Sequence, residues 1–448
     1  MEPTGAPLQN RSKARDRAML RRLRPYCYAW AYILAVHYGY VTYIHPTFEY
    51  AHYTYLPFST AALFSTYFLT SLPIVVYRSS AKPAQAAAAL IYALSYVPIQ
   101  LSLLFSVERS YDKLFWVQAM LASSMSVLFL VAKGKKGQRQ PNSFQFRAMD
   151  RVVVPVALVA VSLMVVVNQD HMRMLSFADV YDLRFAAAAA SRRSGFSDYL
   201  TSWLIYCFIS YLFARGLVHR KWSLLLLGFV CAVLVYMSEG HKSAILLLPI
   251  TMGMLWLWGS GQYFLSRLLS ALTALIAIVS FVIPDQGVGL WMKSILLVRV
   301  VGSGGWLASK YLEYFTPERW TYYSHIRPIN AFMGKYPFGD LSLGQVIGLE
   351  YSGTIQANHN ASFWASDGFA AAGPVGVLIV TPVVAGLLYV MNRIMANLDT
   401  RFVVLWMCGF FVAFLNVPLS TALLSGGGLI IFAQAWLMSR KAIRLRNA

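Results

Sequence analysis

Stretches of apolar residues, each close to the length that crosses a lipid bilayer as a helix, recur along the whole chain. About 20 apolar residues are needed to cross the hydrocarbon layer as an α-helix. In that layer only helices and closed barrels satisfy every backbone hydrogen bond. The sequence therefore predicts an all-α polytopic integral membrane protein with about 12 transmembrane helices. The expected spans lie near 26–45, 56–77, 85–106, 115–132, 152–168, 199–214, 222–238, 243–259, 266–284, 369–390, 402–417 and 420–438.

The composition agrees with a membrane protein. Of the 448 residues, 58% are hydrophobic and 12% are charged, whereas a soluble protein carries about 25% charged residues. The N-terminal residues are polar and basic, and the first apolar stretch is long enough to span a bilayer, which argues against a cleavable signal. The four cysteines fall within apolar segments and are interpreted as small buried residues rather than disulfide partners.

The charge distribution predicts the orientation in the membrane. The net charge is +20. With a cytoplasmic N-terminus, most Lys and Arg residues fall in cytoplasmic segments, including the tails 1–24 and 439–448, and the outer segments stay close to neutral. Because positive charge resists export, both termini are expected in the cytoplasm. Since the basic residues are spread over every cytoplasmic turn, they indicate topology and argue against a nucleic-acid partner.

The cytoplasmic segments and the apolar cores argue against two functional classes. The cytoplasmic loops are short and contain neither a Gly-rich phosphate loop nor a zinc-type spacing of Cys and His, so use of ATP is not expected. The only ionisable residue that we find in the apolar cores is His37. Ion-coupled transporters usually keep several such groups near the bilayer midplane. We therefore interpret His37 as packed and neutral, and ion-coupled transport is disfavoured.

Two outer loops, at 169–198 and 285–368, hold most of the residues that suggest chemistry. Loops of such length are usually functional or disordered. The second is rich in aromatic and apolar residues, so we expect it to fold and to lie partly on the membrane face. In the first, five alanines after Arg184 favour a helix that carries Arg184 and Arg192 on one face. Guanidinium groups suit phosphate oxygens; the alternative is a basic helix on anionic lipid headgroups.

The second outer loop contains cations among apolar and aromatic residues. Arg299 lies in an apolar run just before a Gly-Ser-Gly-Gly stretch, where it needs an acid or a bound anion as partner. Further on, Tyr323, His325 and Arg327 lie in a stretch that is rich in aromatic rings and hydrogen-bond donors. Such a surface suits sugar rings. The alternative is the aromatic belt that membrane proteins commonly carry at the interface.

Asn358, His359, Asn360 and Asp367 lie where this loop re-enters the membrane. Amide side chains both donate and accept, which suits sugar hydroxyls. A carboxylate or an imidazole at this level can accept a proton from an attacking hydroxyl. The alternative is that the Asn and Asp side chains cap the tenth span.

Cations for phosphate, with amides and aromatics for sugars, suit a lipid-linked sugar pyrophosphate. Cleavage between the anomeric carbon and the pyrophosphate develops negative charge on the leaving group, which fixed guanidinium groups stabilise. Energy stored in the pyrophosphate would make ATP unnecessary.

The motifs of the second loop resemble those of a known family. The stretches "RVVGSGGWLASKYLEYF", "YYSHI", "YPFG", "GQVIGLEYSG" and "NHNASFWASDGFAAAGPVG" resemble the Wzy-type O-antigen polymerases, which join oligosaccharide repeat units. That family carries an arginine, ten residues and a glycine in each large outer loop. Arg184 and Gly195 fit this spacing, whereas Arg327 and Gly339 are one residue further apart, which leaves Arg299 as a rival.

The resemblance implies a GT-C-like fold in the bacterial inner membrane, with a periplasmic active site and no metal or other cofactor. It implies a glycosyltransferase that moves the growing glycan from undecaprenyl pyrophosphate to the terminal sugar of a new lipid-linked repeat unit. A chain-length regulator is implied as a partner, beside membrane lipid. An O-antigen ligase, a lipid-linked oligosaccharide flippase and a non-enzymatic membrane subunit remain as alternatives.

The resemblance and the chemistry together select ten candidate site residues. The expected catalytic residues are His359, Asp367, Arg184 and Arg299. The expected substrate-binding residues are Arg192, Tyr323, His325, Arg327, Asn358 and Asn360.

Overall fold

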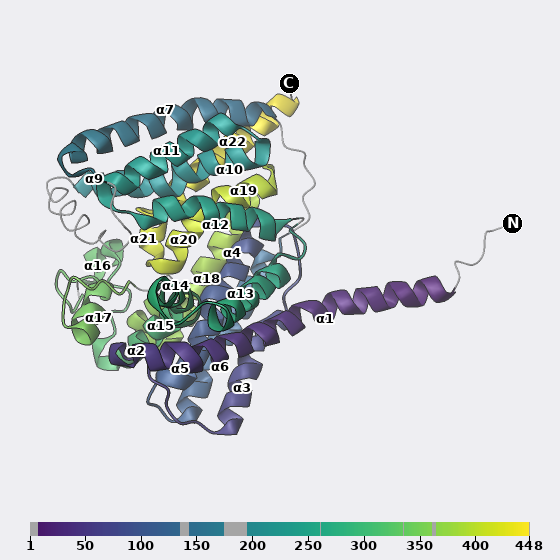
Figure 1. Cartoon of the computed structure of the whole chain (residues 1–448), viewed down its shortest axis with the longest axis vertical. Helices are drawn as coiled ribbons and strands as arrows, with labels where there is room; N and C mark the ends of the chain where they lie inside the picture. The colour runs from purple at the N-terminus through teal and green to yellow at the C-terminus, as the bar shows by residue number, and fades with distance from the viewer. Residues whose placement is uncertain are drawn as a thin grey trace.

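A computed structural model of the chain describes residues 8–134, 143–173, 195–259, 261–334, 336–360 and 364–447. Within these residues the regular secondary structure is helical and contains no β-strand. Most helices pack into one bundle, from which the N-terminal part of α1 (Leu8–Gly39) projects (Figure 1). The prediction of an all-α protein is confirmed for this part of the chain.

Eight helical stretches are long and apolar enough to cross a membrane, judged by length and composition. Two further apolar helices, Thr60–Val75 and Lys242–Trp258, are shorter. These helices support a polytopic membrane protein, and the number of 12 spans stays a prediction. The eight stretches are Pro83–Ser106, Tyr111–Ala132, Phe146–Asn168, Tyr199–His219, Trp222–Glu239, Phe264–Phe281, Gly287–Tyr314 and Ala365–Ile394.

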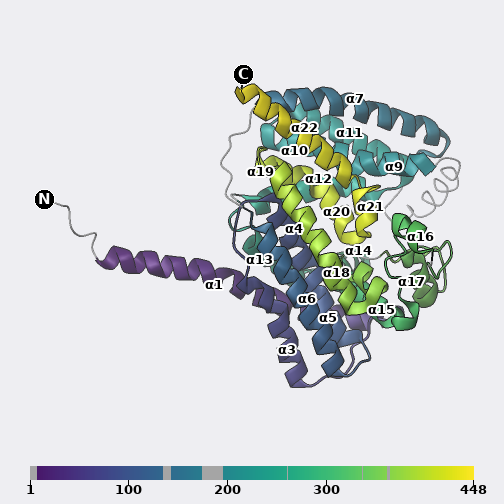
Figure 2. The same ribbon diagram turned by 180° about the vertical axis from the view of Figure 1, so that it is seen from behind.

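The bundle consists of two groups of helices (Figures 1 and 2). One group contains α1, α3 (Thr60–Ser71), α4 (Pro83–Ile91), α5 (Val97–Ser106), α6 (Tyr111–Ala132), α13 (Phe264–Phe281) and α18 (Ala365–Ile394). The other contains α7 (Ser143–Asn168), α9 (Gly195–Trp203), α10 (Ser210–His219), α11 (Trp222–Glu239), α12 (Lys242–Trp258), α19 (Thr400–Trp406), α20 (Cys408–Asn416) and α22 (Gly428–Asn447).

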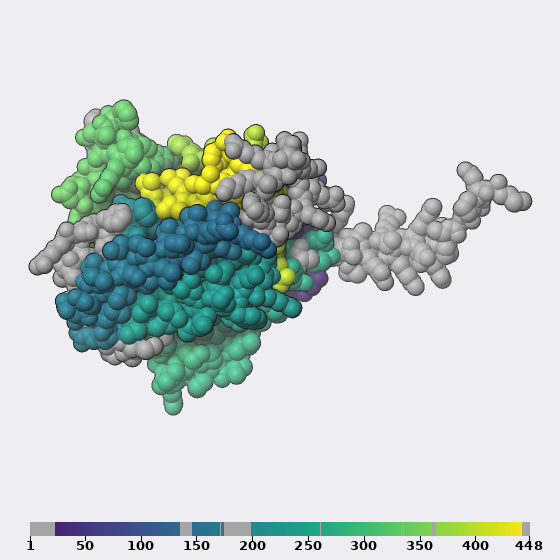
Figure 3. Space-filling model, turned by 90° about the horizontal axis from the view of Figure 1, so that it is seen from above, coloured from purple at the N-terminus to yellow at the C-terminus, as the bar shows by residue number. Residues whose placement is uncertain are grey.

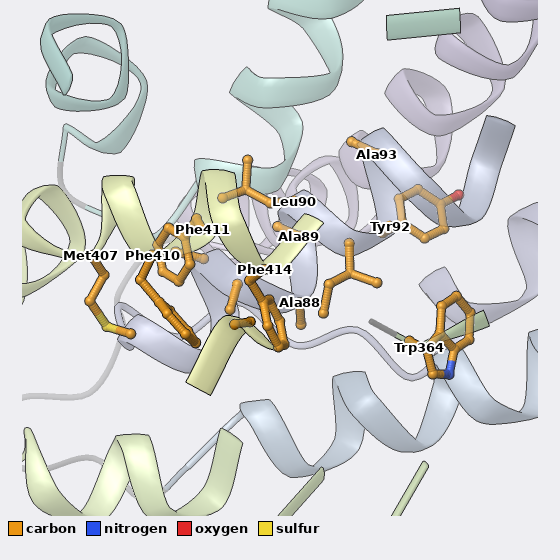
Figure 4. Packing of buried hydrophobic residues seen from close by; sticks show 14 of the residues in the cluster. Ala88, Ala89, Leu90, Tyr92, Ala93, Trp364, Met407, Phe410, Phe411 and Phe414 are labelled. Atoms are coloured by element: carbon orange, nitrogen blue, oxygen red, sulfur yellow. The ribbon is translucent and has the colours of Figure 1, made fainter. Parts of the chain in front are cut away.

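The two groups meet where α4 lies against α20. The alanines of α4 are buried, and Ala88 and Ala89 belong to the same buried cluster as Phe410 and Phe414 of α20 (Figure 4). Small side chains on one helix let a neighbouring helix approach closely, which is how helices associate where lipid removes the hydrophobic driving force. The run of alanines in α4 therefore fits a helix–helix contact.

The isolated histidine of the apolar cores has polar partners. The two ring nitrogens of His37 contact the hydroxyl groups of Tyr67 and Tyr55. The ring also packs on Phe105, with ring centres 4.8 Å apart. This packing agrees with the interpretation of His37 as a structural residue.

The segment expected as the second outer loop is largely helical. It contains α14 (Gly287–Leu297), a π-helical turn at Val298–Gly302, α15 (Ser303–Tyr314), α16 (Arg327–Met333) and α17 (Leu343–Ser352). Of these, α14 is seen nearly end-on in Figure 1, whereas α7 and α11 run across the view. In Figure 3, α16 and α17 form the light-green lobe beside the bundle.

A helical stretch at 287–314 lies within the segment expected as the second outer loop, and the position of that segment relative to a membrane stays a prediction. It is one of the eight stretches that are apolar enough to span a membrane. Its second part, α15, packs along α5, and the contact is close because Gly305 carries no side chain: a Cβ there would lie 2.4 Å from the carbonyl oxygen of Pro98. The apolar run of this helix contains two basic residues, Lys293 and Arg299. In the fold, Lys293 is buried and donates to Asp285 over 2.7 Å.

Candidate functional site

A polar pocket of about 340 Å³ opens where α16, α17 and the short helix α21 (Leu419–Leu423) meet. This volume lies at the small end of the range for ligand pockets, roughly 300–1,000 Å³. Most of its lining can form hydrogen bonds. Its polar side chains include His325, Arg327, Asn330, Asp340, Asn360, Ser420 and Thr421.

Beside the pocket, helix α18 is broken near its start. Ala372 and Gly373 have non-helical backbone angles, and Gly373 has φ +59°, a conformation that favours glycine. Proline follows at 374 and cannot donate to the helix. The short first part of α18 folds back on the long second part, so that Gly368 lies against Gly376: a Cβ on Gly376 would lie 2.1 Å from the Gly368 carbonyl oxygen.

The loop before α16 donates hydrogen bonds to backbone carbonyl oxygens on both sides of this break. The backbone N–H groups of Thr321 and Tyr322 each donate over 2.9 Å to carbonyl oxygens in the first part of α18. The hydroxyl of Tyr323 donates to the carbonyl oxygen of Gly376 over 2.6 Å. Backbone groups that a broken membrane helix leaves free are commonly satisfied in this way. Tyr323, expected as a glycan contact, therefore holds the broken helix, and burial raises its pKa to about 12.

The same loop places His325 against Asp367. The Nδ1 atom of His325 lies 2.8 Å from the hydroxyl of Thr321, and its Nε2 atom lies 3.7 Å from Oδ1 of Asp367. The other carboxylate oxygen accepts the backbone N–H of Leu419 over 3.0 Å, at the start of α21. Asp367 thus links α18 to α21 from behind the pocket wall, whereas His325 itself lines the pocket.

This pair is buried and incompletely satisfied. The side chains of His325 and Asp367 are 5% and 4% exposed. Neither Nε2 of His325 nor Oδ1 of Asp367 has a hydrogen-bond partner among the described residues. Burial lowers the pKa of His325 to about 4, because the charged imidazolium loses its hydration. His325 is therefore neutral near pH 7.

Of the stretch at 358–360, only Asn360 lies in the pocket lining. Asn358 is exposed at the surface, and its side-chain oxygen packs on Gly344, where a Cβ would lie only 2.0 Å away. The chain is fixed here by a hydrogen bond from the N–H of His359 to the carbonyl oxygen of Gly344, over 3.0 Å.

His359 points away from the pocket lining. Its ring contacts Trp306 edge-on, with ring centres 5.1 Å apart, and its Nε2 atom lies 2.8 Å from the hydroxyl of Ser352. The hydroxyl of Tyr311 donates to its backbone oxygen over 3.0 Å. Partial burial lowers the pKa of His359. The structure therefore brings Asn360, His325 and Arg327 to the pocket, but not His359.

The four candidate arginines have different positions. Arg327 is the first residue of α16; it is exposed and lines the pocket. Arg299 is exposed on the π-helical turn and is not part of the pocket lining. Burial raises the pKa of the nearby Tyr53, and the charge of Arg299 partly offsets that rise. Arg184 and Arg192 lie outside the described residues.

Several lining residues were missed from the sequence. Ser420 and Thr421 were included in the twelfth expected span, but α22 begins only at Gly428, because the Ser-Gly-Gly-Gly stretch that follows α21 interrupts the helix. Asp340 follows the Tyr-Pro-Phe-Gly stretch, whose Pro and Gly indicate a turn. The turn was readable from the sequence, but its position at a pocket was not.

Among the described residues, the pocket lining combines one guanidinium group, one carboxylate, one imidazole, two amides and several hydroxyls. Amide and hydroxyl side chains can form hydrogen bonds with sugar hydroxyls, and a guanidinium group can bind phosphate. Among the described residues no group of three or more His, Cys, Asp and Glu side chains could hold a metal ion. Comparison of the chain with protein-family models, with curated proteins and with solved structures found no significant match.

Proposed function

We propose that this chain is a polymerase of lipid-linked oligosaccharide repeat units, of the O-antigen polymerase type. It transfers the growing glycan from undecaprenyl pyrophosphate to the terminal sugar of a new lipid-linked repeat unit. The new bond forms at the anomeric carbon of the donor, and the pyrophosphate leaves with the lipid.

The observation that carries the proposal is the polar pocket at the junction of α16, α17 and α21. It lies at one end of an apolar helical bundle, so a substrate with a lipid tail can keep the tail in the bilayer while its polar part enters the pocket. A lining of amides, hydroxyls and one arginine suits a glycan that carries a phosphate group.

The orientation of the chain is part of the proposal. The projecting part of α1 and the C-terminus lie on one side of the bundle, and α16 and α17 lie on the other (Figures 1 and 2). With both termini in the cytoplasm of a bacterial inner membrane, as the basic residues indicate, the pocket faces the periplasm. Lipid-linked repeat units that have been moved outward are then within reach.

The pocket residues divide between the two parts of the substrate. We assign Arg327 to the pyrophosphate, because a guanidinium group stabilises the charge that develops on the leaving group. Asn360 and Asn330 contact sugar hydroxyls, to which an amide both donates and accepts. His325 is part of the pocket wall, and Asp367 supports that wall from behind. Arg184, Arg192 and Arg299 remain candidates for a second phosphate contact.

The proposal is tested by deleting the gene in the source strain and separating its lipopolysaccharide on a gel. A polymerase deletion collapses the ladder to core plus a single repeat, because repeats are still made, moved outward and attached. A plasmid that carries the wild-type gene restores the ladder. If no repeat reaches the core, the chain acts as a flippase or a ligase instead. A ladder that is unchanged by the deletion contradicts the proposal.

A further inference from the structure

The proposed transfer needs a group that takes the proton from the attacking sugar hydroxyl. Imidazoles are the commonest groups for this role, but one of the two in this region is almost completely buried and the other is not part of the pocket lining. The side chain of His325 is 5% exposed; its Nδ1 atom lies 2.8 Å from the hydroxyl of Thr321, and its Nε2 atom, which has no hydrogen-bond partner among the described residues, lies 3.7 Å from Oδ1 of Asp367. His359 packs on Trp306 and points its Nε2 atom to a serine outside the pocket lining.

The two carboxylates near the pocket differ in their access to it. Asp367 is 4% exposed, is not part of the lining, and uses one oxygen to accept the N–H of Leu419. Asp340 lines the pocket and is exposed. No hydrogen bond or ion pair of its carboxylate occurs among the described residues. Asp340 is therefore the one carboxylate in the described lining whose oxygens are both free to meet a substrate.

Asp340 is also held by a well-defined turn. The hydroxyl of Tyr336 donates to the carbonyl oxygen of Leu341 over 2.7 Å, which closes the two ends of the turn. The N–H of Leu341 donates to the carbonyl oxygen of Phe338 over 3.2 Å, and Gly339 has φ +60°. The N–H of Tyr336 donates to the side-chain oxygen of Asn330 over 3.2 Å.

The element that follows the turn is fixed as well. Ser342 caps α17 through a capping box, in which its hydroxyl accepts the N–H of Gln345 and the Gln345 side chain accepts the N–H of Ser342. These contacts fix the backbone on both sides of Asp340, so little backbone conformational entropy is lost there when a substrate binds. Precise placement of this kind is what a general base needs.

We propose that Asp340 is the general base of the transfer and that Tyr336 is its positioning residue; this rests on the proposed function. The oxygen of the acceptor hydroxyl forms a bond to the anomeric carbon of the donor glycan. The bond from that carbon to the pyrophosphate oxygen breaks, and its electron pair leaves with the pyrophosphate. The hydroxyl proton passes to the Asp340 carboxylate and then to solvent. Arg327, in the same lining, stabilises the charge on the leaving group.

The test uses the purified full chain in lipid nanodiscs, with an undecaprenyl-pyrophosphate-linked repeat unit as donor and acceptor. General-base catalysis contributes about 10²–10⁴-fold, so Asp340→Asn is expected to lower kcat at least about 100-fold while KM changes little. Glu350→Gln is the matched control, because Glu350 is exposed on α17 and is not part of the pocket lining. We expect this control to keep the wild-type rate.

Two further variants separate a base from a merely structural carboxylate. Asp340→Ala leaves room for a small anion, so added formate is expected to restore part of the rate, and formate is expected to leave Asp340→Asn unchanged. Tyr336→Phe opens one end of the turn and is expected to lower kcat by less than the loss of the carboxylate does. Because Asp340 is exposed, we expect its variants to keep the wild-type melting temperature.

Each outcome decides the proposal. Loss of rate in Asp340→Asn with formate rescue of Asp340→Ala supports it. A wild-type rate in Asp340→Asn, or loss of rate without formate rescue, overturns the assignment of the base and leaves the proposed function intact. A wild-type chain that forms no polymer from this substrate overturns the proposed function and the base together.

Discussion

The Nε2 atom of His325 lies 3.7 Å from Oδ1 of Asp367, and both side chains are almost completely buried. The two residues come from the loop before α16 and from the first part of α18. Asp367 also accepts the N–H of Leu419, so the pair joins three elements around the pocket. This relationship leads to the first two predictions.

Replacing Asp367 by alanine removes the acceptor of the Leu419 N–H and leaves that buried donor unsatisfied. A buried donor without a partner costs about 1–3 kcal/mol, so we expect a lower melting temperature in detergent. Asp367→Asn keeps an acceptor oxygen at the same place and should stay closer to the wild type. Equal melting temperatures for the wild type and Asp367→Ala would show that this contact does not hold α21.

Acid is expected to destabilise the fold through His325. Its pKa is about 4 in the folded chain, below the ordinary value of about 6.5. Between these two values the unfolded chain binds the proton and the folded chain does not, so stability is present above about pH 6.5 and falls as the pH drops toward 4. Melting temperatures across this range should fall less steeply for His325→Gln. Identical slopes for the two proteins would contradict the burial of a neutral imidazole.

The break in α18 is expected to depend on Gly373. This residue has φ +59°, and a Cβ would lie 3.0 Å from the ring of Trp320. With ψ −147° this conformation is one that essentially only glycine adopts, and a side chain held there costs roughly 1–3 kcal/mol. Gly373→Ala should therefore destabilise the chain and disturb the loop that holds His325. Gly386→Ala is the control on the same helix, since a Cβ there meets no atom within 4 Å. Thermal unfolding of both variants checks the difference, and equal effects would argue against a strained break.

Arg184 is expected to be essential for chain extension. The prediction rests on its spacing to Gly195 and on the suitability of guanidinium for pyrophosphate. Arg184→Ala should abolish the ladder while the amount of protein in the membrane stays normal. The measurement is a lipopolysaccharide gel beside an immunoblot of the tagged protein. Ladders of near-normal length from this variant would exclude Arg184 from the site.

Much of the helical fold was predictable because apolar length is a local property. The expected spans at 85–106 and 115–132 agree closely with Pro83–Ser106 and Tyr111–Ala132. The segment 285–368 was expected to fold because of its apolar and aromatic residues, but the burial of Lys293 against Asp285 within the helix at 287–314 is visible only in the fold. Apolarity alone does not separate a span from a helix that lies against the bundle.

The candidate site was predictable only in part, because its contacts join residues far apart in the sequence. The stretch that contains His325 and Arg327 was expected at a site, and both residues line the pocket. The contact between Asp367 and Leu419 crosses 52 residues and has no local signature. Residues adjacent in the sequence can also have different surroundings: Asn360 lines the pocket, whereas the side chain of His359 packs on Trp306.

The most direct measurement of the central claim is a polymerisation assay with the purified chain and an undecaprenyl-pyrophosphate-linked repeat unit, without ATP or nucleotide sugars. We expect lipid-linked oligomers that grow by one repeat unit at a time, with one undecaprenyl pyrophosphate released for each new glycosidic bond. If the repeat unit stays monomeric and no undecaprenyl pyrophosphate is released, the chain is not a polymerase.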